Sequence, residues 1–304
     1  MSEGSKKQLI EEINILRQQK NAIILAHYYQ PDEIQDIADF VGDSLQLAQK
    51  AAGTKADVIV FCGVHFMAES AAILSPEKIV LLPEPEAGCP LADMINVEEL
   101  REEKRKYPGA KVVCYVNSSA AVKAESDICC TSSNAERVVT SLGDQDIIFV
   151  PDGNLGKYVA AKTNKKIICW QGFCPTHHRI SKEDVLQSKK LHPEAKILVH
   201  PECREEVWRE TDYVGSTSGI IKYAENSPAK QFIIGTECGI LHELKKRCPD
   251  KEFFFITDHM LCPNMKKNSL EKVKACLLTL SPRITVPEDI RKKAIAALEK
   301  MLTV

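Results

Sequence analysis

Short apolar runs alternate along the chain with longer segments in which apolar and polar residues are mixed at helical spacing. The runs DVIVFCG (57–63), QDIIFVP (145–151) and KQFIIGT (230–236) are almost continuously apolar. Such runs are typical of parallel strands that helices cover on both faces. The alternation therefore predicts an α/β protein with parallel sheets.

The pattern repeats three times. Each repeat opens with an apolar strand that ends in an aromatic or imidazole side chain, at His27, Tyr115 and His200. A turn with small hydroxyl-bearing residues follows 17, 17 and 16 residues later, as GDS, TSS and GST. The strand ends are 88 and then 85 residues apart, and this nearly constant pitch indicates a repeated structural unit.

The second half of each repeat recurs as well. A second strand and a helical stretch lead to a third strand, which is KIVLLPE, KKIICWQ or KEFFFIT, and then to a Cys-Pro pair. The three cysteines are Cys89, Cys174 and Cys262, which are 85 and 88 residues apart. A helix follows each pair. We therefore expect every repeat to be strand–helix–strand–helix–strand–helix.

This organisation predicts three three-layer αβα sandwich domains with short parallel sheets, related by a pseudo-threefold axis. The expected boundaries are 1–104, which includes an N-terminal helix, 105–190 and 191–283, with a C-terminal helix over 284–304 that packs back on the first domain. Ligands of parallel sheets gather beyond the carboxyl ends of the strands. We therefore expect an active site at the central junction of the three domains.

Charge and composition argue against several classes of function. The chain has 304 residues and a net charge of -2, so no basic surface favours nucleic acid. Its apolar runs are too short to span a bilayer, and its N-terminus resembles a charged amphipathic helix rather than a signal peptide. We expect a cytoplasmic protein that binds neither nucleic acid nor membrane. Its twelve cysteines are then expected to be reduced, as core residues or metal ligands.

The three in-register cysteines are the best candidates for metal ligands. Proline keeps the residue before it extended, which holds each thiol on a stiff loop. Structural zinc sites usually use four ligands at local spacings such as CxxC. Three thiolates from three repeats suit instead a [4Fe–4S] cluster with one open iron, which can act as a Lewis acid. Spacing alone also allows buried loop residues. Cys248-Pro249 is out of register, and we expect it to end a helix.

Polar side chains occupy the ends of the first strands. They form pairs two residues apart, which share one face of a strand: His27 and Tyr29, Tyr115 and Asn117, His200 and Glu202. The hydroxyl turns precede helices, whose N-termini favour anions; their residues are Ser44, Ser132, Ser216 and Thr217. Singly, each is consistent with an edge residue or a helix cap. Repeated around one centre, they predict a site for a ligand with several anionic groups.

Ordered motifs along nearly the whole chain resemble those of the quinolinate synthase family. They include ILAHYYQ, IADFVGDSLQLA, GVHFMAE, YVNSSA, CTSSNA, PDGNLG, HPEC, YVGSTSG, GTECGI and CPNMKKN, besides the Cys-Pro pairs. The resemblance implies an enzyme of NAD biosynthesis that condenses iminoaspartate with dihydroxyacetone phosphate to quinolinate, with loss of phosphate and water. It also implies a functional link to the enzyme that supplies iminoaspartate.

The resemblance further implies a [4Fe–4S] cluster on Cys89, Cys174 and Cys262. Ser44, Ser132, Ser216 and Thr217 would hold the carboxylates and the phosphate. His27, Tyr29, Tyr115, Asn117, His200 and Glu202 would orient the triose and move protons, with Glu202 as general base, His200 in support and Tyr29 as proton donor. Some relatives carry a C-terminal CxxCxxC; here no cysteine follows Cys276, so we expect no disulfide control of that kind.

Two other functions fit parts of the pattern. An iron–sulfur electron carrier would need four thiolates and an exposed cluster, and no fourth cysteine is in register. A threefold ligand-binding module without metal would use the cysteines only for packing. Binding of triose phosphate by metal-free protein would favour that second alternative.

Overall fold

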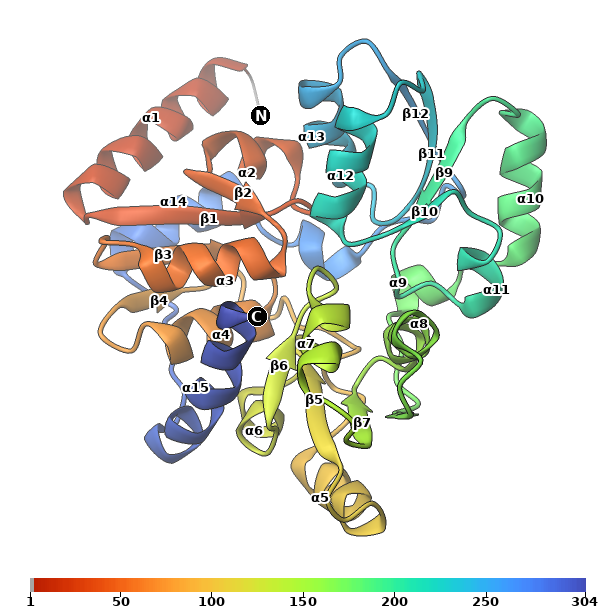
Figure 1. Ribbon diagram of the computed structural model, residues 1–304. Coiled ribbons are helices and arrows are strands. Elements are labelled where there is room, and N and C mark those ends of the chain that lie inside the picture. Colours follow the sequence, from red (N-terminus) through yellow and green to blue (C-terminus); the bar gives the residue numbers. More distant parts are fainter. Residues whose placement is uncertain (1–2) are drawn as a thin grey trace.

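The computed structural model describes residues 3–304, and within that range it contains three parallel four-stranded sheets around a common centre (Figure 1). Their strand orders are β2-β1-β3-β4, β6-β5-β7-β8 and β10-β9-β11-β12, which is the same topology three times. Helices flank each sheet. The predicted fold class, three αβα units with short parallel sheets, is confirmed. No helix among the described residues is long and apolar enough to cross a membrane.

The first sheet shows how the strand sequences build the layers. It consists of β1 (Ala22–His27), β2 (Phe40–Gly42), β3 (Val58–Cys62) and β4 (Ile79–Leu81), with α1 (Glu3–Gln19), α2 (Asp32–Ile37), α3 (Ser44–Gly53) and α4 (His65–Leu74). Successive side chains of a strand point to opposite faces. Ile24 therefore packs with residues of α1 and α2, whereas Leu25 packs with residues of α3 and α4.

The second and third sheets are built in the same way. The second has β5 (Lys111–Tyr115), β6 (Ile128–Cys130), β7 (Ile147–Val150) and β8 (Ile167–Cys169), with α5 (Val97–Lys106), α6 (Ala120–Ala124), α7 (Ala135–Ser141) and α8 (Gly153–Thr163). The third has β9 (Lys196–Val199), β10 (Tyr213–Val214), β11 (Gln231–Gly235) and β12 (Glu252–Phe255), with α10 (Lys182–Leu191), α11 (Glu205–Trp208), α12 (Thr217–Asn226) and α13 (Ile240–Arg247). Short helices, α9 (Pro175–His178) and η1 (Pro263–Lys266), follow two of the Cys-Pro cysteines.

Each unit has one strand more than the three expected from sequence. The extra strands, β2, β6 and β10, are only two or three residues long and pair with the first strand of their unit. An aspartate before each of them accepts a hydrogen bond from a backbone N–H at the start of that first strand: Asp39 from Ile24 (2.8 Å), Asp127 from Val112 (2.8 Å) and Asp212 from Ile197 (2.9 Å). These short strands are held by the aspartates rather than by a long apolar run.

Two C-terminal helices connect the units. The predicted boundaries place α14 (Leu270–Thr279) with the third unit, but its buried residues pack with those of α1 and β3 on the first sheet. They likewise place α10 with the second unit, but its buried Val185 packs with β9 of the third. The helix α15 (Glu288–Thr303), blue in Figure 1, contacts α4 of the first unit and also α6 and β6 of the second. The end of the chain thereby packs between the first and second units.

Candidate active site

The three Cys-Pro loops are held by the same backbone hydrogen bond in each unit. The donor is the N–H three residues beyond β3, β7 or β11, and the acceptor is the carbonyl two residues before the cysteine. The pairs are His65 to Ala87 (2.8 Å), Gly153 to Gly172 (2.8 Å) and Cys238 to Met260 (2.7 Å). The repeat therefore extends to the placement of Cys89, Cys174 and Cys262.

All three of these cysteines line one central cavity, whose empty volume is about 650 Å³. The cavity lies where the three units meet, because its lining comes from all of them. Burial raises the pKa of the Cys89 thiol to about 12, that of Cys174 well above its usual value, and that of Cys262 as well. In each loop the backbone N–H of the residue three positions after the cysteine acts against this increase in pKa. These residues are Ala92, His177 and Met265.

The residues that sequence reasoning assigned to the site converge on this cavity, with one exception. Those that line it are His27, Tyr29, Ser44, Cys89, Tyr115, Asn117, Ser132, Cys174, His200, Glu202, Thr217 and Cys262. The exception is Ser216, whose hydroxyl caps α12 by accepting the N–H of Gly219 (3.2 Å) and faces a neighbouring surface cavity. Asn117 Oδ1 is buried without a hydrogen-bond partner, so the cavity wall has an open polar position.

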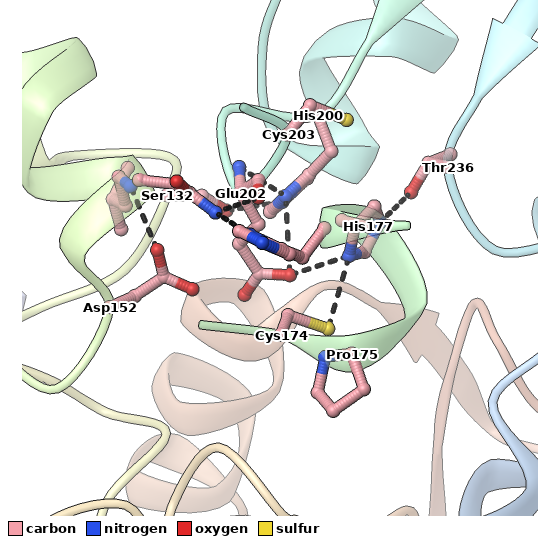
Figure 2. Close-up of polar contacts among 12 residues, drawn as sticks. Ser132, Asp152, Cys174, Pro175, His177, His200, Glu202, Cys203 and Thr236 are labelled. Atoms are coloured by element: carbon pink, nitrogen blue, oxygen red, sulfur yellow. Dashed lines mark hydrogen bonds and ion pairs between the residues drawn. The ribbon is translucent and has the colours of Figure 1, made fainter. Parts of the chain in front are cut away.

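Glu202 is the centre of the hydrogen-bond network (Figure 2). Tyr115 donates its hydroxyl to Oε1 (2.7 Å), and His177 Nδ1 lies 2.7 Å from Oε2. Burial favours the neutral acid, but His200, His177 and Tyr115 together outweigh it and lower the pKa of the Glu202 carboxyl to about 2. Glu202 is therefore ionised at neutral pH and already holds two donors.

The histidines at the strand ends are neutral. Burial lowers the pKa of His27 to about 4 and that of His200 to about 3. In both, Nδ1 accepts a backbone N–H two residues on, from Tyr29 (3.1 Å) and from Glu202 (3.3 Å). This fixes the ring proton on Nε2, and in His200 that nitrogen lies 3.1 Å from the hydroxyl of Ser132.

Tyr29 joins the first unit to the third. Its hydroxyl accepts a hydrogen bond from Thr217 (2.8 Å) and lies 2.6 Å from Thr236 Oγ1. Burial raises the pKa of Tyr29 well above its ordinary value, so the phenol keeps its proton. His177 Nε2 lies 2.9 Å from the same Thr236 hydroxyl, which places Tyr29 and Glu202 in one continuous network.

Several lining residues were not assigned to the site from sequence. His177 stacks on His200 (ring centroids 4.7 Å apart) and lies 3.3 Å from Cys174 Sγ through Nδ1. Its position three residues after a Cys-Pro cysteine was the available signal. Glu237 and Asp43 also line the cavity. Asp43 lies in the GDS turn and Glu237 follows the KQFIIGT strand, but only the hydroxyls of the turns were assigned to the site.

Asp43 is the point at which the three hydroxyl turns meet. Its Oδ2 accepts hydrogen bonds from Ser133 of the second unit (2.6 Å) and Ser218 of the third. Its Oδ1 accepts the N–H of Gln46 (3.1 Å) and caps α3. We call this set the Asp43 junction. Asp43, rather than Ser44, is thus the cap of the first turn.

The donor set suits a group bound through sulfur. Three thiols from three loops line one cavity, and the thiolate is the form of cysteine that binds a metal. A second set, Cys174, His177 and Glu202, has ligand atoms within 4.8 Å of one another and could hold a single metal ion. Of the described residues, the cavity lining includes no fourth cysteine, and Cys248 ends α13 elsewhere, as expected.

Comparison with known proteins agrees with these features. The family model described as "NadA: Quinolinate synthetase A protein" matches residues 11–303. The chain is 59% identical over 297 residues to a "Quinolinate synthase" of Methanosarcina barkeri, covering 98% of each chain. It is 58% identical to "Quinolinate synthase 1" of Methanosarcina acetivorans, covering 97% of each, and 59% identical to a "Quinolinate synthase" of Caldicellulosiruptor saccharolyticus, covering 96% of each.

Proposed function

This chain belongs to the quinolinate synthase family and is an enzyme of NAD biosynthesis, and from that premise we propose that it condenses iminoaspartate with dihydroxyacetone phosphate on a [4Fe–4S] cluster. The observation that carries the proposal is the convergence of three in-register cysteines on one central cavity. The proposal includes the residues that would bind the substrates and transfer protons.

Cys89, Cys174 and Cys262 would hold the cluster. When bound, it would supply a Lewis-acidic iron, because three thiolates leave one iron without a protein ligand. Cationic iron would also favour the thiolate forms, which burial disfavours in the protein alone.

Neutral donors would receive the anionic groups of the substrates. Among the described residues, none that lines the cavity is lysine or arginine. Ser44 and Thr217 are the first residues of α3 and α12, so free backbone N–H groups and the helix dipoles accompany their hydroxyls. The open position beside Asn117 Oδ1 suits a donor such as a triose hydroxyl or an imine N–H.

Proton transfer would use the network around Glu202. A carboxylate whose pKa is about 2 is a weak base by itself. A proton taken from substrate would therefore stay on Glu202 only briefly. His177 already donates Nδ1–H to Glu202 (2.7 Å), so it would accept a proton only at Nε2, which faces the Thr236 hydroxyl (2.9 Å). Neutral His200 would support this step. Tyr29, which keeps its phenol proton, would act as the proton donor to the substrate.

The alternatives differ from this proposal in what they require of the cavity. An electron carrier needs a fourth thiolate, and no fourth cysteine lines the cavity in residues 3–304. A metal-free binding module leaves unexplained why three cysteines from three units line one cavity. We also propose that the enzyme works in the cytoplasm. There it would act directly after the enzyme that supplies iminoaspartate.

The test is to measure iron and acid-labile sulfide per chain in protein kept free of oxygen. We expect about four of each, lost on exposure to oxygen. Changing Cys89, Cys174 or Cys262 to serine should abolish both the cluster and quinolinate formation. The matched control Cys248→Ser should leave both intact, because Cys248 lies outside the cavity. Equal behaviour of all four variants would contradict the proposal.

A further inference from the structure

The residue two positions beyond β3, β7 and β11 differs among the three units. It is Val64, Asp152 and Glu237, and each adjoins the loop that carries a proposed cluster cysteine. In the first unit the side chain is apolar. In the third it is a carboxylate that is completely buried yet lines the cavity. A buried charge needs specific partners, so Glu237 calls for an explanation.

The partners of Glu237 are the cysteine loop itself and a lysine that follows it. Oε1 accepts the backbone N–H of Cys262 (3.3 Å) and lies 3.0 Å from Lys266 Nζ. Oε2 accepts the N–H of Gly239 (2.7 Å). The carboxylate therefore fixes both ends of the Cys262–Lys266 turn against the end of β11.

Lys266 connects the Cys262–Lys266 turn to the first unit. Its ammonium group also donates to the backbone carbonyl of Tyr29 (2.6 Å). Gly239 permits the close approach, because a Cβ there would lie 2.8 Å from Lys266 Nζ and 2.8 Å from the Tyr29 backbone. Gln30 Nε2 adds a hydrogen bond to the carbonyl of Met265 (2.8 Å) in the same turn.

We propose that the Glu237–Lys266 ion pair is a positioning device that orients Cys262 toward the cluster and couples that orientation to Tyr29. The inference rests on the proposed function, since it presumes a cluster on Cys262. Glu237 acts through the Cys262 N–H and the lysine, so it is a positioning residue. Groups that orient a metal ligand typically change metal affinity by about 10–100-fold when they are removed.

The test uses three variants, Glu237→Gln, Lys266→Met and the double variant, with Lys267→Met as the matched control. Lys267 is the neighbouring lysine, and its ammonium group donates to the Glu86 carbonyl (2.8 Å) at the surface. The readouts are the rate at which an iron chelator removes the cluster without oxygen, the midpoint potential of the cluster and its EPR spectrum. None of them depends on enzyme activity.

We expect each single variant to lose its cluster about 10-fold faster or more, and Lys267→Met to match the wild type. The two potentials should shift in opposite directions. Glu237→Gln leaves an unpaired cation that favours the reduced cluster and raises the potential, whereas Lys266→Met leaves an unpaired anion and lowers it. The double variant should return close to the wild-type potential, because the pair acts as a unit.

General loosening of the fold would not give shifts of opposite sign. Shifts in the same direction, or cluster loss at the wild-type rate in both single variants, would overturn the inference while leaving the proposed function standing. Wild-type protein that takes up no iron and sulfide would overturn the proposed function and this inference with it. Should Glu237→Gln fail to fold, the rate and the sign of the Lys266→Met shift still decide the question.

Discussion

Two neutral histidines buried at strand ends should make the cluster-free protein less stable in mild acid. The pKa values of His27 and His200 are lowered by burial to about 4 and about 3, from an ordinary value of 6.5. Below pH 6.5 the unfolded chain binds a proton on each ring, and the folded protein does so only near pH 4 and below. The free energy of unfolding must therefore fall as the pH falls through this window.

The size of the effect follows from the same values. Each proton bound by the unfolded state alone lowers the free energy of unfolding by about 1.4 kcal/mol per pH unit. At pH 5 each histidine should thus lower stability by about 2 kcal/mol relative to pH 7. Glu202 adds little here, because its lowered pKa matters only below its ordinary value of 4.5. Asp152 acts in the opposite direction, since burial raises its pKa.

Comparing variants with the wild type isolates each histidine from Asp152. Urea unfolding of cluster-free protein, followed by circular dichroism at pH 7, 6 and 5, gives the stability of wild type, His27→Gln and His200→Gln. In each variant the loss between pH 7 and pH 5 should be smaller than in the wild type by about 2 kcal/mol. Identical losses in all three proteins would refute the assignment of neutral, buried imidazoles.

Three further predictions concern named contacts. Replacing Asp43 with alanine removes a helix cap and the two serine hydrogen bonds of the Asp43 junction, and should lower the free energy of unfolding in urea by about 2–3 kcal/mol. Gly239→Ala should destabilise by about 1–3 kcal/mol through overpacking, whereas a Cβ on Gly53 meets nothing within 4 Å, so Gly53→Ala should be neutral or slightly stabilising. Tyr115→Phe leaves the buried Glu202 one donor short, and should cost about 1–3 kcal/mol in urea unfolding and slow quinolinate formation in a steady-state assay.

The sequence was informative wherever a feature occurred three times. The pitch of the strand ends and of the Cys-Pro pairs sufficed to predict three units and to bring His27, Tyr115 and His200 to one cavity. The outer strands were missed because two or three residues carry no periodic signal, and an aspartate rather than apolar burial holds them. The helix α14 was grouped with the wrong neighbour sheet, since its amphipathic pattern does not say which sheet it covers.

Single features were harder to foresee than repeated ones. Glu237 and Lys266 are 29 residues apart, and their pairing depends on how the Cys262 turn docks against the first unit. His177 follows a Cys-Pro cysteine, but its contact with Glu202 joins loops of two different units. Contacts of this kind arise from the assembly of the three units, and no local pattern of apolar and polar residues encodes them.

The residue two positions past β3, β7 and β11 has a further meaning for a molecule built of three similar units. Three identical chains around a threefold axis would carry the same side chain at all three places, because one gene would encode them all. Units joined in one polypeptide are free to differ at the three positions, as they do at Val64, Asp152 and Glu237. A ligand without threefold symmetry needs such differences. Gene fusion thus offers a route from a symmetric ring to a site in which each wall has its own chemistry.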